Sequence, residues 1–229
     1  MKERIKIPSG RAKLARVVRN AGDVVRIKDA VDTLELNRPD ASKLLSRWVN
    51  QGWLRRIGPG LYLPVSIDSL GSEHVLEDPW ILVPALFEPA YVSGWSAAEY
   101  WDLTEQIFRK IVVMTAGPLR EREKSVHGVP FILRRISPKH IFGTRSVWRG
   151  KSKVAVADIH RVIIDMLQEP GLGGGIQHVE DCFIRYLGRK DSDLAILIDY
   201  AIKLGNGAVF KRLGFFAERQ KLNLLVQHC

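Results

Sequence analysis

The chain has 229 residues, of which 46% are hydrophobic and 26% are charged. This composition is that of a globular protein, because enough apolar residues are present to offset the entropy lost on folding. The length suits one large or two modest domains. The longest compact apolar run, residues 81–87, is too short for a membrane helix. Cys182 and Cys229 alone support neither a disulfide framework nor a zinc finger.

The opening residues, MKERIKIPSGRAK, are too charged for a signal peptide. With two cysteines only, the composition favours a reducing compartment, and we expect a cytoplasmic protein that needs no cofactor and no metal. The formal net charge of +10 favours a polyanionic partner.

The charge is unevenly distributed along the chain. Residues 1–70 contain 14 basic residues (Lys and Arg) and 7 acidic ones (Asp and Glu), and residues 71–105 contain 0 basic and 7 acidic residues. Residues 106–153 contain 12 basic and 2 acidic residues, and residues 154–229 contain 9 of each. Two basic segments are therefore separated by an acidic one.

Three helices are predicted in the first fifty residues. Apolar residues recur at helical spacing over residues 11–21, 24–34 and 39–51. Pro39 suits the first position of the third helix, where its missing N–H costs nothing. Gly52 ends this helix as a C′ glycine.

The predicted third helix has two different faces. The apolar face, expected to pack on the other helices, contains Ala41, Leu44, Leu45 and Trp48. The opposite face is small, polar and basic, with Pro39, Ser42, Lys43, Ser46, Arg47 and Asn50. Short serines let a helix approach a groove while long cations reach phosphates or guanine edges, which indicates DNA contact. The DNA-contacting residues expected here are Arg38, Ser42, Lys43, Ser46 and Arg47.

A basic β-hairpin follows the third helix. Residues 53–64, WLRRIGPGLYLP, contain two short strands around a Gly-Pro-Gly turn. The first strand carries Arg55 and Arg56, which we expect to contact phosphates or the minor groove. Three helices followed by a basic hairpin, with a tight turn before the third helix, are typical of a winged helix-turn-helix DNA-binding domain. We expect this domain to occupy residues 1–70.

The remainder, residues 71–229, is predicted to be a second domain, and the class of the protein is α+β. A polar link over residues 67–77 marks the boundary. Helices are expected over residues 78–87, 94–103, 158–168, 177–187, 192–204 and 208–220, and strands over residues 90–93, 108–115, 146–148, 153–156 and within 126–136. These elements form a mixed α/β domain, with a small sheet that has helices before it and a helical tail after it.

Several segments are similar to one protein family. In chain order they are IGPGLYLPV, YVSGWSAAEYWDLT, DMLQEPGLGGG and KRLGFFAE. With this succession the chain resembles the AbiEi family of antitoxins over nearly its whole length, although none of the segments is a catalytic signature.

The resemblance implies a DNA-binding domain that represses its own operon at inverted repeats in double-stranded promoter DNA. It also implies a C-terminal antitoxin domain that counteracts a nucleotidyltransferase-type toxin of a type IV toxin–antitoxin, phage-defence locus. A stable complex with that toxin is not expected, nor is a membrane partner.

Three patterns that could suggest an enzyme have simpler explanations. The glycine run at residues 171–175 follows a helix and lacks the phosphate-loop sequence, so we expect a turn between helices. Asp158 is placed to cap a helix, and Arg161 and Asp165 have the spacing of an i, i+4 ion pair. No Asp or Glu has a Lys two positions later, which disfavours the common nuclease arrangement.

The second basic segment has two interpretations. Its cations are either balanced by the acidic residues 71–105 or form a second nucleic-acid surface, for flanking DNA or for an RNA connected with the toxin's target. The residues of that possible surface are Arg120, Arg122, Lys124, Arg134, Arg135, Arg145, Arg149, Lys151 and Lys153, the first three on a predicted loop. Trp148 lies among them and is the aromatic residue best placed to stack on a base.

We therefore expect a DNA-binding repressor and antitoxin, not an enzyme. Two alternatives stay open: a winged-helix regulator whose second domain senses a small ligand, and a nucleic-acid-processing enzyme.

Overall fold

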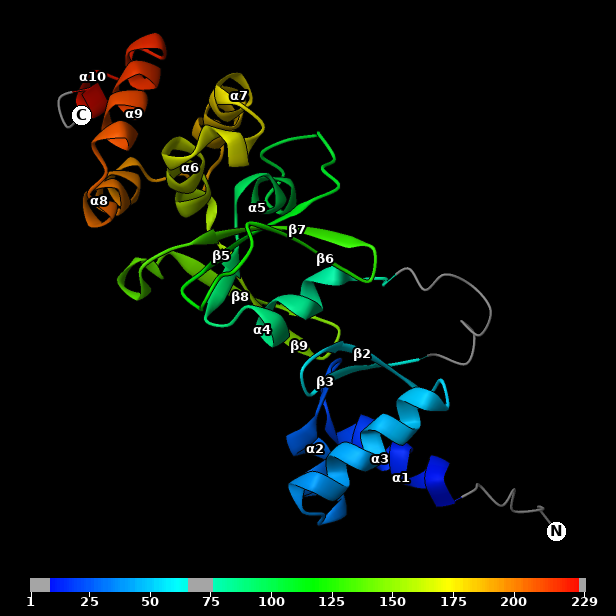
Figure 1. Cartoon of the computed structure of the whole chain (residues 1–229). Coiled ribbons are helices and arrows are strands. Elements are labelled where there is room, and N and C mark those ends of the chain that lie inside the picture. The colour runs from blue at the N-terminus through cyan, green and yellow to red at the C-terminus, as the bar shows by residue number, and fades with distance from the viewer. Residues whose placement is uncertain (1–8, 66–75, 227–229) are drawn as a thin grey trace. The chain divides into compact units, whose positions relative to one another are not determined.

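The computed structural model describes residues 9–65 and 76–226, and the chain divides into two compact units (Figure 1). The first unit extends to Leu86 and includes the turn Trp148–Ser152, and the second contains Phe87–Val147 and the chain from Lys153 onward. The expected boundary between residues 70 and 71, and most of the polar link over residues 67–77, lie outside the described residues.

Residues 9–65 contain helices and short strands. In chain order they are α1 (Ser9–Asn20), β1 (Val25–Arg26), α2 (Ile27–Leu34), α3 (Arg38–Asn50), β2 (Leu54–Gly58) and β3 (Leu61–Pro64). The strands form an antiparallel sheet of order β1-β3-β2. Two short helices, η2 (Pro79–Leu82) and α4 (Val83–Leu86), complete the described part of this unit. The predicted first helix, third helix and hairpin are confirmed within two residues.

The second helix is shorter than the sequence predicts. Val25 and Arg26 pair with β3 instead of continuing a helix. The Asp29 carboxylate accepts the backbone N–H of Arg26 at 2.6 Å, which caps the helix so that it begins at Ile27. The helix predicted over residues 24–34 is therefore wrong at its start, because a strand partner some 35 residues away along the chain, near Leu61, captures these residues.

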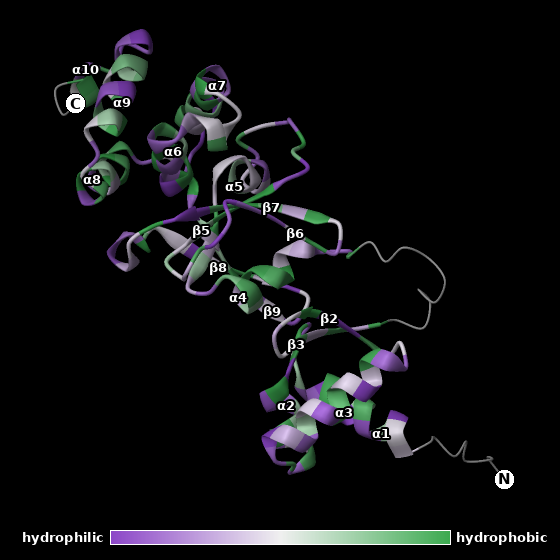
Figure 2. Ribbon diagram, viewed as in Figure 1, coloured by the Kyte–Doolittle hydropathy of each residue, from purple (hydrophilic) through white to green (hydrophobic). Residues whose placement is uncertain are grey.

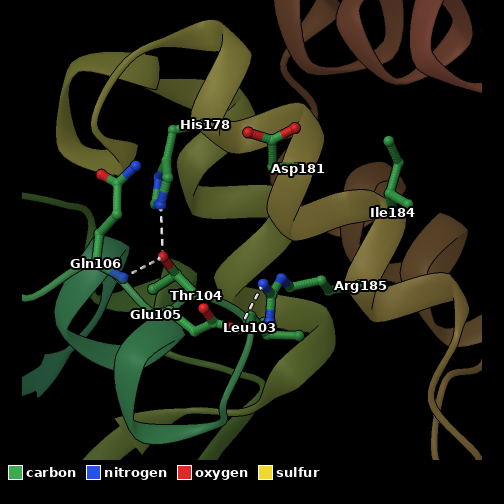
Figure 3. A pocket seen from close by; sticks show the side chains of 8 residues that line it. All are labelled: Leu103, Thr104, Glu105, Gln106, His178, Asp181, Ile184 and Arg185. Carbon is green, nitrogen blue, oxygen red and sulfur yellow. Dashed lines mark hydrogen bonds and ion pairs between the residues drawn. The ribbon is translucent and has the colours of Figure 1, made fainter.

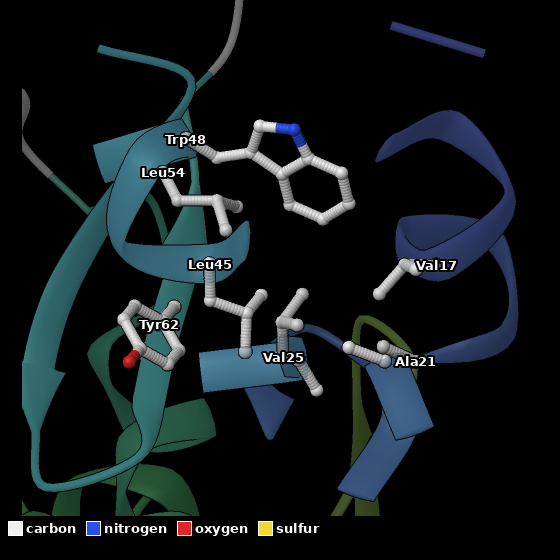
Figure 4. Packing of buried hydrophobic residues seen from close by; sticks show 9 residues of the cluster. Val17, Ala21, Val25, Leu45, Trp48, Leu54 and Tyr62 are labelled. Carbon is white, nitrogen blue, oxygen red and sulfur yellow. The ribbon is translucent and has the colours of Figure 1, made fainter. Parts of the chain in front are cut away.

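A buried apolar cluster holds α1 and α3 on the short sheet (Figure 4). It includes Val17 and Ala21 of α1, Val25 of β1, Leu45 and Trp48 of α3, Leu54 of β2 and Tyr62 of β3. Leu45 is 0% exposed and Trp48 is 1% exposed, as predicted for the inner face of this helix. Hydrophobic and hydrophilic residues alternate along α3 accordingly (Figure 2). Close packing of this cluster fixes the rotation of α3 about its axis.

A six-stranded mixed sheet forms the described centre of the second unit. In spatial order the strands are β6 (Glu123–Val126), β7 (Val129–Arg135), β5 (Ile111–Thr115), β4 (Ala90–Val92), β9 (Ser152–Ala157) and β8 (Thr144–Arg149). β4 runs parallel to β9 and β5 runs parallel to β7, whereas β4–β5 and β6–β7 are antiparallel. All five residues of β5 are buried, as its apolar run predicts.

Strand β6 was not predicted from the sequence. Its first three residues, Glu123, Lys124 and Ser125, are exposed, so the strand lacks the alternation of a half-buried strand. It lies at the edge of the sheet, where charged residues are common. The loop predicted for Arg120, Arg122 and Lys124 is therefore wrong at Lys124, which lies opposite Phe131 of β7.

The helices of the second unit gather around α6. They are α5 (Gly94–Tyr100), α6 (Ile159–Gln168), α7 (Ile176–Leu187), α8 (Leu194–Leu204), α9 (Gly207–Arg219) and α10 (Asn223–Val226), with short turns η3 (Pro138–His140) and η4 (Pro170–Gly173). α6 contacts α5, α7, α8 and α9, and all of its residues up to Leu167 are buried (Figure 1). The predicted order of strands followed by a helical tail is confirmed, although α10 was not predicted.

A buried polar network joins α6 to the sheet. Arg161 and Asp165 form the predicted ion pair at 2.8 Å, with side chains 0% and 1% exposed. The second carboxylate oxygen accepts the hydroxyls of Tyr91 at 3.0 Å and Ser93 at 2.7 Å, and Arg161 donates to the Tyr91 hydroxyl at 2.9 Å. Burial raises the pKa of Tyr91 well above its usual value, so the hydroxyl stays protonated and donates. The network compensates in part for the burial of two charges, because Nη1 of Arg161 has no hydrogen-bond partner among the described residues.

Breaking this ion pair should strongly destabilise the second unit. Asp165→Ala leaves Arg161 buried without its counter-charge, so the free energy of unfolding should fall by about 3–5 kcal/mol. Asp199→Ala is the matched control, because Asp199 forms another i, i+4 ion pair, with Lys203 at 2.7 Å. Both side chains of this pair are about half exposed. It should cost at most about 1 kcal/mol in urea unfolding followed by circular dichroism. Equal losses for the two variants would contradict this account.

Candidate nucleic-acid interface

The start and the end of α3 are both fixed by local contacts. The Asn37 side chain accepts the backbone N–H of Asp40 at 2.9 Å and donates to its carboxylate at 2.8 Å. Pro39 follows Arg38 and is the second helical residue, one position later than predicted. Gly52 has a φ of +71° after the C-cap residue, as a C′ glycine requires.

The outward side of α3 is a cationic face. Its exposed residues are Arg38, Pro39, Asp40, Lys43, Ser46, Arg47 and Asn50, while Ser42 is half-buried. The side chains of Arg38, Lys43 and Arg47 make no ion pair or hydrogen bond with another residue that the structure describes. Asp40 carries the one carboxylate on this face, and Asn37 holds it. The face therefore presents three long cations around short side chains.

The two arginines of the hairpin point to opposite sides of β2. Arg55 lies opposite Leu63 of β3, and Arg56 lies opposite Tyr62. Successive residues of a strand face opposite ways, so the two guanidinium groups do not form a single contact point. Arg56 is exposed and its Nε donates to the carbonyl of Gly58 at 3.2 Å, whereas Arg55 is half-buried.

Four cations on α1 were missed from the sequence. Arg11, Lys13, Arg16 and Arg19 are all exposed, and α1 contains no acidic residue. Arg16 donates to the carbonyl of Thr33 at 3.1 Å, and Arg11 lies over the Trp53 ring. The absence of Asp and Glu from the helix is the signal that could have identified this second basic surface of the first unit.

The second set of cations does not form one surface. Arg149 and Lys151 belong to the first unit, where Arg149 lies 3.5 Å from the Asp78 carboxylate and stacks over Trp80. Arg134 pairs with Glu169 at 2.8 Å. Lys124 and Arg145 lie on β6 and β8, the two opposite edges of the sheet, which five strand spacings of about 4.8 Å place roughly 24 Å apart.

Part of the set does come together at one end of β6. The carbonyl of Arg122 accepts the backbone N–H of Leu133 at 2.7 Å, so the start of β6 lies beside the end of β7. This β6 corner, as we name it, contains Arg120, Arg122, Lys124 and Arg135, all exposed. Lys153 of β9 and Trp148, which is 66% exposed, lie on other strands.

The residues that could have suggested enzyme chemistry are engaged elsewhere. Asp158 accepts the backbone N–H of Arg161 at 2.8 Å, which confirms its predicted role as a helix cap. His160 bonds to Tyr186, and His178 bonds to Thr104. Among residues 9–65 and 76–226, no three His, Cys, Asp or Glu side chains are arranged to hold a metal ion. In the same residues, no helix has the length and hydrophobicity to cross a membrane.

Comparison with known proteins identifies the N-terminal part of the chain. Residues 12–65, from α1 to β3, match a family described as transcriptional regulator, AbiEi antitoxin. None of the curated proteins matches the chain. The resemblance is thus confirmed for the N-terminal part and stays a prediction for the rest. Residues 12–65 of the chain are therefore similar to the AbiEi family of antitoxin transcriptional regulators.

Proposed function

We propose that residues 9–65 form a winged helix-turn-helix that represses transcription by binding double-stranded promoter DNA at inverted repeats. In this proposal α2 and α3 are the helix-turn-helix, α3 is the recognition helix, and β2 and β3 are the wing. The observation that carries it is the cationic face of α3, turned outward by the burial of Leu45 and Trp48. The match to a family of transcriptional regulators supports it.

The exposed cations divide into two roles under this proposal. Lys43 and Arg47 lie one helical turn apart, beside Ser42 and Ser46, where their side chains can reach base edges in the major groove. Arg38, Arg55, Arg56 and the cations of α1 serve the DNA backbone, which supplies affinity without sequence preference.

Removing the two central cations should weaken promoter binding. Lys43→Ala and Arg47→Ala should each cost about 1–3 kcal/mol of binding free energy, with the larger loss on the specific site rather than on random DNA. The control is Lys211→Ala, which removes the same charge from an exposed position on α9. Gel-shift titrations of the full chain on the DNA upstream of its own gene measure the effect. Unchanged affinity in folded variants would show that α3 is not the recognition helix.

We further propose that the second unit is the antitoxin part of a type IV toxin–antitoxin, phage-defence locus in the cytoplasm. Its functional partner would be a nucleotidyltransferase-type toxin, with no stable complex between the two proteins. The description of the family as antitoxin supports this role, and so does the separate buried core of the second unit around α6. The β6 corner is the surface that we assign to a nucleic acid connected with the toxin's target, because its four exposed cations outnumber the two exposed carboxylates beside them, Glu121 and Glu123.

Repression and rescue should therefore be separable. Arg120→Glu with Arg122→Glu reverses two charges of the β6 corner and should impair the rescue of cells that express the neighbouring toxin gene, while promoter repression persists. The double variant Lys43→Ala, Arg47→Ala should do the opposite. Growth on toxin induction and a promoter-reporter assay measure the two activities. Full rescue by a folded charge-reversed variant would show that the corner is only a solvated surface.

A second candidate function is a regulator whose second unit senses a small ligand. A cavity in that unit, described below, favours this candidate.

A further inference from the structure

The second unit contains a cavity of about 400 Å³ between α7 and the chain that follows α5 (Figure 3). Its lining residues are Leu103, Thr104, Glu105, Gln106, His178, Asp181, Ile184 and Arg185. The volume lies within the range of small-molecule sites in proteins. Neither the cationic face of α3 nor the β6 corner includes any of these residues.

Hydrogen bonds hold the two walls of the cavity in place. Thr104 Oγ1 lies 2.7 Å from His178 Nε2, and the other ring nitrogen of His178 bonds to the carbonyl of Gly173. A carbonyl only accepts, so Nδ1 carries the proton, and Nε2 accepts the Thr104 hydroxyl. The backbone N–H of Gln106 also donates to Thr104 Oγ1, at 3.0 Å. Thr104 and His178 are therefore positioning residues that tie the wall to α7.

The α7 side of the cavity carries one group of each charge. Asp181 and Arg185 are four residues apart, so they share a face of the helix with about 5–6 Å between their Cβ atoms. Arg185 donates through one nitrogen to Glu105 at 2.8 Å, which leaves most of its five N–H groups available. The Asp181 carboxylate makes no hydrogen bond or ion pair with the rest of the described chain. Leu103 and Ile184 add an apolar wall.

From this arrangement we propose that the cavity binds a small zwitterion, of the class of amino acids and dipeptides. The ligand's carboxylate would accept from the Arg185 guanidinium, which is suited to carboxylates, and its ammonium group would donate to Asp181. The short apolar part of the ligand would lie on Ile184, which is 44% exposed. A ligand with a carboxylate alone would leave Asp181 without a partner, and a ligand with an ammonium group alone would leave Arg185 with Glu105 as its one charged partner among the described residues. A zwitterion contacts both groups and should therefore bind more tightly than either analogue.

Matched probes test the requirement for both charges. Isothermal titration calorimetry of the full chain with 4-aminobutanoate, glycylglycine and the free L-amino acids should find at least one zwitterion that binds. Butanoate and butylamine, which each keep one charge of 4-aminobutanoate, should bind at least about tenfold more weakly. Asp181→Asn and Arg185→Gln should each weaken binding of the zwitterion by about tenfold or more, while Asp199→Asn, at an exposed position of α8, leaves it unchanged.

Three results would overturn the proposal. They are binding of no zwitterion, equal binding of butanoate or butylamine, and unchanged affinity in the folded Asp181 and Arg185 variants. Thr104→Val gives a further check, because loss of the Thr104 hydroxyl should weaken ligand binding although this residue contacts neither charge of the ligand. Thermal unfolding verifies that the Thr104→Val variant is folded. The experiment uses no DNA and no toxin, so its outcome is independent of the repressor and antitoxin roles proposed above and bears only on the ligand-sensing candidate.

Discussion

The packing of Leu45 and Trp48 against α1 and the short sheet is the constraint on which the functional account depends. Both side chains are almost fully buried, so α3 cannot rotate about its axis without exposing them. The other side of the helix is thereby fixed toward solvent, and Lys43 and Arg47 are presented there without carboxylate partners among the described residues. A surface of this kind attracts a polyanion through long-range charge and then offers short serines that permit close approach.

The elements that the sequence predicted well are those with local signals. α1 and α3 have apolar stripes and recognisable ends, and the hairpin has its Gly-Pro-Gly turn. Residues close together in the sequence therefore determine where these elements form. β1 depends on β3, far along the chain, and local helical spacing misassigned it. β6 was missed because an exposed edge strand has no apolar alternation. The spacing of apolar residues in a sequence indicates which residues are buried. Both wrong predictions concern strands whose pattern of buried residues does not show that they pair with another strand.

The candidate sites follow the same division. The outer face of α3 was predictable because one helix contains all of it. The Arg161–Asp165 pair was predictable from spacing, but its burial and its partners Tyr91 and Ser93, some 70 residues away, were not. How the cations of residues 106–153 are distributed was not predictable, because Lys124 and Arg145 lie on strands at opposite edges of the sheet. The cavity beside α7 likewise appears only once distant segments fold together.

The central claim is that the outer face of α3 lies against DNA bases. Site-specific photo-crosslinking tests it most directly, with a benzoylphenylalanine at Ser46, whose exposed position lies between Lys43 and Arg47. The account predicts that this probe crosslinks to bases of the chain's own promoter fragment. An excess of unlabelled promoter DNA should abolish these crosslinks by competition, whereas unrelated DNA should not. A probe at Ala12 on α1 should give at most crosslinks that unrelated DNA removes. Specific crosslinks from Ala12 with none from Ser46 would contradict the account.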